Sequence, residues 1–322
     1  MTLQQLQYAV TIAETGSMNE AAKQLFITQP SLSGSIKELE NDLGVTIFSR
    51  TNKGVALTSE GREFMGYARS VLGQMDLLLD RYQGQTGKKK FGVSTQHYSF
   101  AVNAFVQVLQ KYDMGLYEFA IRETRTADII LDVASGRSEI GILYKNDFNE
   151  KVMDKLLKSY ELSFVPMFTC KGFVYLWKNH PLASKKKITL KDLEDYPCLS
   201  FEQGDTASLQ YAEEILSTYD YKKTIKACDR ATMLNLMVGV NAYTLCSGII
   251  CEELNGEDCI AVPLDVEVKM NIGYITRKKV ALSTMGEEYI SAIRDYVTPL
   301  LPPNDIDDSF NNWVPLKMNN PV

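Results

Sequence analysis

The chain has 322 residues, 45% hydrophobic and 23% charged, which is ordinary for a globular protein and long enough for two or three domains. It has no apolar run of the roughly 18 residues that suggest a membrane span, and its N-terminus has no signal-peptide pattern. We therefore expect a cytoplasmic protein with no membrane partner. The formal net charge of −6 excludes binding of nucleic acid through bulk charge alone.

Three helices are predicted in the first 44 residues. Apolar residues spaced by three and four predict the first helix over residues 2–14. Ser17 and Thr28 are suitable N-caps for the second and third helices, Pro30 suits the first turn of the third, and Gly44 ends it. Alternating residues at 45–48 and 55–57 predict two strands around a turn. The pattern is a helix-turn-helix followed by a wing.

A long helix is predicted over residues 59–83, capped by Thr58. Its apolar residues recur at steps of 4, 3, 4, 3 and 4, the pattern of a coiled-coil seam. We interpret this stripe as a dimer interface, and the alternative is packing against the helix's own domain. The residues of the stripe are Phe64, Ala68, Val71, Met75, Leu78 and Tyr82.

Strands and helices alternate after residue 88. Strands at 91–94, 117–122 and 140–144 with intervening helices predict a βαβαβ unit around a parallel sheet. A second such unit is predicted over 173–245, including a helix at 206–219. A last helix is predicted from Thr284 to about Leu300, and the chain from Pro302 is predicted to be loose.

Six cysteines lie between residues 170 and 259, and the chain has only two histidines. No Cys-x-x-Cys pair occurs, so we expect neither a zinc site nor any other metal or cofactor. Buried thiols are the simplest interpretation of these cysteines, and a redox-sensing pair of Cys251 with Cys259 is the alternative.

Residues 1–65 resemble the LysR-type transcriptional regulators closely, and the rest of the chain does so more loosely. The stretches that carry the resemblance are AAKQLFITQPSLS at 21–33, IKELE at 36–40, LGVTIFSR at 43–50 and LTSEG at 57–61. Further on, VASG at 133–136, EIGI at 139–142 and HPLA at 180–183 are typical of the effector domain of that family.

The resemblance implies an α/β protein with an N-terminal winged helix-turn-helix, a linker helix, and a two-lobed effector domain like the type 2 periplasmic binding proteins. The implied assembly is a homodimer or homotetramer, with RNA polymerase as a candidate partner. The implied domains are 1–58 for DNA binding, 59–87 for the linker, 88–301 for the effector domain and 302–322 for a tail. Lobe I would take about 91–162 and 268–300, and lobe II about 163–267.

We expect the third helix to read double-stranded DNA, although residues 1–65 hold five basic and seven acidic side chains. Gln29 can bond bidentately to adenine, and serine or threonine hydroxyls reach bases or phosphates. For Thr28 and Ser31 the alternative is simple helix capping. The candidate DNA-binding residues are Thr28, Gln29, Pro30, Ser31, Ser33, Ser35 and Lys37, with Arg50 and Lys53 of the wing facing phosphates.

A small-molecule effector is expected beyond the carboxyl ends of the strands. Hydroxyls, an amide and an imidazole at the start of a helix suit an oxyanion, and the Ser/Thr-Gln turn is similar to the sulfur-metabolism branch of the family. Capping by Ser94 and Thr95 and a packed core position for His97 are the alternatives. The candidate effector-binding residues are Ser94, Thr95, Gln96, His97, Thr124, Tyr144, Ser200, Phe201 and Gln203.

Two other classes of function are disfavoured by the sequence. An enzyme is disfavoured because the chain has no nucleophile elbow and no P-loop, so no catalytic residues are assigned. A solute-binding transport component would share the two lobes but would lack the winged helix-turn-helix and would need export. The prediction is a transcription regulator that is not an enzyme.

Overall fold

The computed structural model describes residues 1–51, 54–83, 89–112, 117–204, 208–251, 256 and 258–311. The chain forms two compact units, the first mainly from Met1–Gly87 and the second mainly from Lys88 onward. No helix among these described residues is long and apolar enough to cross a membrane.

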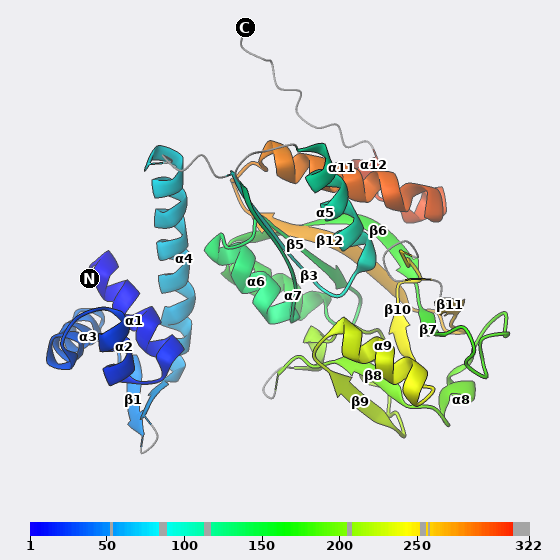
Figure 1. Cartoon of the computed structure of the whole chain (residues 1–322), viewed down its shortest axis with the longest axis horizontal. Helices are drawn as coiled ribbons and strands as arrows, with labels where there is room; N and C mark the ends of the chain where they lie inside the picture. The colour runs from blue at the N-terminus through cyan, green and yellow to red at the C-terminus, as the bar shows by residue number, and fades with distance from the viewer. Residues whose placement is uncertain are drawn as a thin grey trace, which may run out of the picture. The chain divides into compact units, whose positions relative to one another are not determined.

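The first unit is a helix-turn-helix with a two-stranded wing (Figure 1). Leu6, Ile12, Leu32 and Leu39 are buried where the first three helices meet, and Ile47 joins them from the start of the wing. The elements are α1 (Leu3–Thr15), α2 (Met18–Gln24), α3 (Gln29–Leu43), β1 (Phe48–Thr51), β2 (Gly54–Leu57) and α4 (Ser59–Gln83).

Local capping explains where α3 begins and ends. The Thr28 side chain accepts a hydrogen bond from the Ser31 amide, and Gly44 ends the helix at φ 68°, in the left-handed region that glycine adopts readily. The Glu40 carboxylate accepts hydrogen bonds from the amides of Ile47 and Phe48 at 2.6 and 3.0 Å. These bonds hold the chain against α3, and β1 begins at Phe48 rather than at residue 45 as predicted.

A five-stranded sheet in the order β4-β3-β5-β12-β6 forms the first half of the second unit, called lobe I below. The predicted parallel pairing is confirmed for β3, β4 and β5. Two further strands extend the sheet: β12 pairs antiparallel with β5, and β6 pairs antiparallel with β12. The strands are β3 (Lys89–Thr95), β4 (Tyr117–Glu123), β5 (Ile140–Lys145), β6 (Leu162–Lys171) and β12 (Lys269–Arg277).

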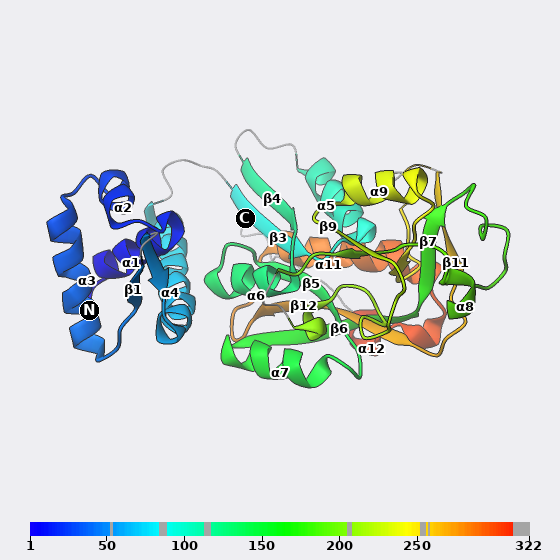
Figure 2. The ribbon, with the colours of Figure 1, turned by 90° about the horizontal axis from the view of Figure 1, so that it is seen from below.

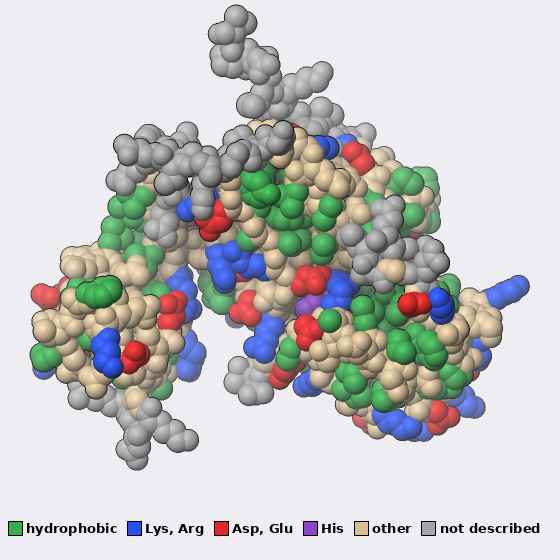
Figure 3. All heavy atoms as spheres, in the orientation of Figure 1, with side chains coloured by type: hydrophobic (Ala, Val, Ile, Leu, Met, Phe, Trp, Pro, Cys, Tyr) green, Lys and Arg blue, Asp and Glu red, His purple; other side chains and the backbone are tan. Residues whose placement is uncertain are grey.

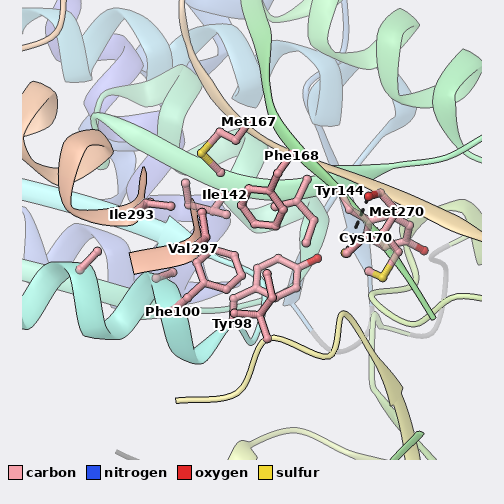
Figure 4. Packing of buried hydrophobic residues seen from close by; sticks show 14 of the residues in the cluster. Tyr98, Phe100, Ile142, Tyr144, Met167, Phe168, Cys170, Met270, Ile293 and Val297 are labelled. Carbon is pink, nitrogen blue, oxygen red and sulfur yellow. Dashed lines mark hydrogen bonds between the residues drawn. The ribbon is translucent and has the colours of Figure 1, made fainter. Parts of the chain in front are cut away.

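Helices cover both faces of this sheet (Figures 1 and 2). On one face α5 (Ser99–Lys111) and α11 (Thr284–Val297) pack together, and on the other lie α6 (Thr126–Ser135) and α7 (Glu150–Ser159). The core of the first face is aromatic: the Phe100 ring stacks on Tyr98 at 5.1 Å and meets Phe168 edge-on at 5.5 Å (Figure 4).

The second half of the second unit, called lobe II below, is a mixed arrangement rather than the parallel repeat that was predicted. β8 (Cys198–Phe201) and β9 (Thr224–Ala227) run parallel. β7 (Phe173–Trp177) pairs antiparallel with β10 (Thr244–Cys246) and β11 (Cys259–Pro263). The described residues of lobe II also form the helices α8 (Leu190–Leu193) and α9 (Arg230–Gly239).

The predicted helix at 206–219 is wrong for its described part, residues 208–219, which form one 3₁₀ turn, η1 (Leu209–Tyr211), and then turns. Glu213 and Glu214 are both buried here, where their carboxylates accept hydrogen bonds from other segments. Those long-range bonds override the local helical pattern, because a buried carboxylate is costly unless it is hydrogen-bonded.

The sequence predicts that the chain passes from lobe I to lobe II between residues 162 and 163, and this boundary stays a prediction. In the structure β6 pairs with β12 from Leu162 to Lys171, so this strand belongs to the sheet of lobe I over its full length. The chain enters β7 of lobe II directly after Gly172.

The sequence predicts a loose chain from Pro302, but this prediction is wrong for residues 302–311, which form ordered structure. Residues 312–322 lie outside the described chain. η2 (Thr298–Leu300) is followed by η3 (Pro303–Asp305) and α12 (Asp308–Asn311). Ile306 forms a β-bridge with Phe168, and Phe310 is only 2% exposed in the core of lobe I. A buried aromatic ring outweighs the polar composition of the segment.

Phe310→Ala should therefore lower the free energy of unfolding by about 3 kcal/mol, because it leaves a cavity beside Phe168. Urea denaturation of the full chain measures this. The exposed neighbour Asn311→Ala serves as the control and should change stability by less than about 0.5 kcal/mol. Equal stability of the Phe310 variant and the wild type would show that this segment is not part of the core.

Candidate functional site

The start of α3 presents a polar surface opposite its buried face. Leu32, Ile36 and Leu39 point into the core of the first unit. Thr28, Pro30, Ser31 and Lys37 are exposed, and Gln29, Ser33 and Ser35 are half-buried. Residues spaced by four share a helix face, so Gln29, Ser33 and Lys37 form one polar row.

One of these residues, Thr28, also caps the helix. The Thr28 hydroxyl accepts from the Ser31 amide and lies 2.8 Å from the Ser31 hydroxyl. Of the wing residues, Arg50 pairs with Val55 through β1 and β2, while Lys53 lies outside the described residues, as does the side chain of Arg50.

Phe26 was not singled out from the sequence as a functional residue. It lies in the turn before α3, is 95% exposed and has a positive φ of 56°, a backbone conformation that bulky residues rarely adopt. Its signal in the sequence is an aromatic residue at a turn position, which favours small or polar residues.

The apolar stripe of α4 is divided. Ala68 is 2% exposed in the core of the first unit and Phe64 packs against the same core, as in the alternative interpretation of the stripe. Val71 is 45% exposed and Met75 is half-buried. The side chains of Leu78 and Tyr82 lie outside the described residues.

In lobe I, the end of β3 is fully buried. The Ser94 hydroxyl donates to Asp132 at 2.6 Å and lies 2.8 Å from the Ser138 hydroxyl. The Thr95 hydroxyl donates to the Gln96 carbonyl at 2.7 Å. Ser94 therefore joins β3 to α6. Neither side chain caps α5, whose N-cap position, Tyr98, makes no side-chain cap bond.

Gln96 ties this turn to two other segments. Its side-chain nitrogen donates to the Thr126 hydroxyl at 2.7 Å, and its oxygen accepts from the Tyr98 hydroxyl at 3.0 Å and the Tyr144 amide at 3.1 Å. Thr124 lies beside it, with its amide donating to the Thr95 carbonyl at 3.0 Å.

His97 is a candidate residue of lobe I that meets lobe II. Its backbone amide donates to Glu213 Oε2 at 2.9 Å, and its ring Nδ1 lies 2.8 Å from the same oxygen. The ring also stacks on Phe201 with centroids 3.5 Å apart. The Gln203 amide nitrogen donates to the other Glu213 oxygen at 3.0 Å. A carboxylate of the chain itself thus occupies the place where an oxyanion is expected.

Further bonds join the lobes around this contact. The Gln203 oxygen accepts from the Thr126 amide at 3.0 Å. Tyr144 donates from its hydroxyl to the Glu214 carbonyl at 3.2 Å. The structure therefore brings His97, Tyr144, Phe201 and Gln203 together. Ser200 is half-buried in β8, opposite Lys226 of β9.

Glu214 is buried beside Glu213, and burial together with this neighbouring charge raises the pKa of Glu214 to about 8. Its carboxyl group accepts a hydrogen bond from the Phe201 amide at 2.8 Å. Arg230, at the start of α9, forms an ion pair with Glu123 at the end of β4, with its Nε 3.3 Å from Glu123 Oε2. An ion pair thus joins the two lobes as well.

A cavity of about 80 Å³ lies between the start of α5 in lobe I and α9, β7 and β10 in lobe II. His97 and Phe201 border it. Lysine and arginine side chains are interspersed with acidic ones on the visible faces of both units (Figure 3). Among the described residues, no cluster of three His, Cys, Asp or Glu side chains is placed to hold a metal ion.

The six cysteines are free thiols. Burial raises the pKa of Cys170, Cys198, Cys246 and Cys259, which disfavours the reactive thiolate. Cys228 is exposed, and a hydrogen bond to Glu202 raises the pKa of its thiol. Cys251 is buried, and its sulfur accepts from Asn103 at 3.2 Å.

A winged helix-turn-helix followed by a two-lobed α/β domain defines a class of ligand-responsive, DNA-binding regulators. Residues 3–62 match the family described as "Bacterial regulatory helix-turn-helix protein, lysR family", and residues 95–298 match "LysR substrate binding domain". The chain belongs to the LysR family of transcription regulators. The sequence-based predictions of the family, of the fold class and of a protein that is not an enzyme are confirmed.

Similar proteins span nearly the whole chain. The regulator AlsR of Bacillus subtilis is 27% identical over 307 residues, covering 94% of this chain and 93% of AlsR. The dual regulator OxyR of Escherichia coli is 24% identical over 301 residues, covering 91% of this chain and 95% of OxyR.

Solved structures show the same fold. The LysR family regulator CbnR matches with a TM-score of 0.57 at 18% identity, covering 92% of this chain and 99% of CbnR. A full-length OxyR variant from Pseudomonas aeruginosa matches with a TM-score of 0.55 at 20% identity, covering 91% of this chain and 95% of that one.

The raised pKa of Glu214 gives a pH dependence. The folded chain keeps this proton up to about pH 8, whereas the unfolded chain loses it near the ordinary value of 4.5. The contribution to stability is thus present below about pH 4.5 and is lost as pH rises toward 8. Glu214→Gln should remove this downward slope of unfolding free energy with pH.

Urea denaturation at several pH values from about 5 to about 8 measures the slope. The exposed Glu267→Gln is the matched control and should leave it unchanged. If wild type and Glu214→Gln lose stability in parallel over this range, another group carries the pH dependence.

Proposed function

We propose that this regulator reads its operator through the start of α3, with Gln29 and Ser33 facing bases and Lys37, Arg50 and Lys53 facing phosphates. The observation that carries this proposal is the polar row of α3 opposite its buried face. Thr28, Pro30, Ser31 and Ser35 complete the surface. A small number of basic side chains is enough for this purpose, because helix N-termini and backbone amides also bind phosphate.

A neighbouring observation favours the same surface. Phe26 is almost fully exposed directly before α3. Apolar contact with the thymine methyl group is one of the ways in which proteins read the major groove. CbnR has been solved in complex with its target DNA, and its fold is similar to this chain, with a TM-score of 0.55.

The double variant Gln29→Ala with Ser33→Ala should lose protection of specific bases while retaining weak binding to any duplex. Each lost bidentate contact reduces discrimination by about 1–3 kcal/mol, or roughly 5- to 150-fold in affinity ratio. Footprinting on the promoter region of its own gene, with random DNA as competitor, measures this.

Asn41→Ala, exposed at the far end of the same helix, is the control and should keep the wild-type footprint. An unchanged footprint in the double variant would remove these two side chains from base recognition.

We also propose that α4 carries a homodimer interface and that dimers associate further into a homotetramer. The exposed Val71 and Tyr67 on α4 support this, because apolar side chains on a helix surface are commonly covered by a partner. RNA polymerase is proposed as a further partner, and the cytoplasm as the compartment in which the protein acts.

Val71→Glu should weaken this association, because burying an unpaired carboxylate in an apolar interface is costly. Analytical ultracentrifugation over a range of protein concentrations measures it. Arg62→Glu changes the charge at an exposed α4 position outside the stripe and is the control. Identical sedimentation of Val71→Glu and wild type would place the interface elsewhere.

For the effector, we propose a small molecule bound between lobe I and lobe II. The contacts of His97 with Glu213 and Phe201, and the cavity beside them, support this site. That the effector is anionic, and that it belongs to sulfur or amino-acid metabolism, stays a prediction from the sequence. An anionic group at His97 would have to displace the Glu213 carboxylate.

A further inference from the structure

The cavity between the lobes has mainly apolar walls. α9 contributes Met233, Leu234 and Met237, and the chain around and after β10 contributes Leu245, Ile249 and Ile250. Such walls bind the apolar body of a ligand and select by shape, while a few polar groups fix its orientation.

Two hydroxyl groups on one wall have no hydrogen-bond partner. They are Tyr175 Oη and Thr244 Oγ1, in side chains that are 8% and 6% exposed. The two residues face each other directly across the antiparallel pair β7 and β10, so their side chains lie on the same face of the sheet. The nearby Cys259 thiol is only a weak hydrogen-bonding group and does not replace an oxygen or nitrogen partner.

An unpaired buried hydroxyl is unfavourable, and native proteins rarely leave two side by side without a function. Both residues line the cavity. A ligand that offers a hydrogen-bond donor or acceptor at this wall would satisfy both, and the apolar walls would enclose the rest of it.

The charged groups at the cavity are already occupied. Glu213 accepts from His97 and Gln203, and Arg230 is paired with Glu123. Glu214 accepts from the Phe201 amide, and its raised pKa of about 8 keeps it mainly protonated at neutral pH. Among the described residues of the lining, these leave no counter-ion for a ligand charge, and burying an unpaired charge is costly.

We propose that this cavity binds a small, uncharged, mainly apolar molecule with one hydroxyl, carbonyl or amide group, which hydrogen-bonds to Tyr175 and Thr244. The inference rests on the proposed function, because it assigns the chemical class of the effector. It departs from the sequence-based expectation of an anion, since Glu213 itself supplies the carboxylate at His97.

The volume sets the size of the ligand. A cavity of about 150 Å³ accommodates benzene, so about 80 Å³ holds a molecule of roughly three to four non-hydrogen atoms. Because Tyr98 and Ser99 of lobe I and Met233 of lobe II all border the cavity, an occupant contacts both lobes. It therefore stabilises the arrangement in which the lobes are closed.

A matched set of two-carbon compounds tests the class. The full chain is heated with ethanol, acetamide, acetate or ethylamine at pH 7, and the affinity of each is then measured by calorimetry. We expect ethanol and acetamide to raise the melting temperature in a concentration-dependent manner and the two ions to do so far less.

The double variant Tyr175→Phe with Thr244→Val should weaken acetamide binding by about tenfold or more through the loss of its hydrogen bonds. The ligand-free variant should remain as stable as wild type, since only unpaired hydroxyls are removed. Thr218→Val, an exposed threonine of lobe II, is the matched control.

Tighter binding of acetate than of acetamide would overturn the proposal, as would acetamide affinity that is the same in the double variant and the wild type. Absence of binding by all four compounds would also overturn it. The operator footprint is measured in parallel: a lost footprint with intact acetamide binding contradicts the proposed function, whereas an intact footprint without ligand binding contradicts this inference alone.

Discussion

The second unit depends on one contact, the pairing of the buried Glu213 carboxylate with the amide and ring of His97. It places a negative charge of lobe II at the start of α5 in lobe I, where amide groups of a helix start favour an anion. The stacking of His97 on Phe201 and the bonds of Gln203 surround this contact. The bonds are charge-assisted and buried, so they are strong and costly to leave unpaired. This contact defines both the lobe arrangement and the chemistry left for a ligand.

The two proposed functions, DNA binding and effector binding, therefore depend on opposite kinds of surface. In the first unit, a polar row of α3 is kept exposed, while Leu32, Ile36 and Leu39 hold the helix from behind. In the second unit, Glu213, Gln203 and Tyr144 are paired within the chain where the lobes meet, and an apolar cavity is left with two unpaired hydroxyls. An exposed polar surface suits a hydrated phosphate backbone and base edges, whereas a buried one selects a small molecule by shape and few bonds. The LysR family joins these two kinds of unit in one chain.

Contacts between residues that are far apart in the sequence also explain why some predictions from local patterns are wrong. The segment at 208–219 has helical spacing, but Glu213 and Glu214 are hydrogen-bonded to residues far away in the chain, and no regular helix forms. The same holds for the segment from Pro302, where burial of Phe310 outweighs a polar composition. Ser94 and Thr95 carry the hydroxyls expected at a ligand site, yet Ser94 bonds to Asp132 and both are fully buried. For Glu213, Phe310 and Ser94 the partner is distant in the sequence, and no local pattern contains it.

The amino-acid sequence by itself determined the helix-turn-helix, its caps at Thr28 and Gly44, the long α4 and the parallel β3, β4 and β5, because spacing and capping act within a few residues. It also placed His97, Phe201 and Gln203 among the candidates for the site between the lobes. Only the tertiary structure decided that Glu213 fills the expected anion position and that Tyr175 and Thr244 face a cavity. Those features arise from strands and turns brought together across the fold, and the free energy of burial that selects them is a property of the packed chain as a whole.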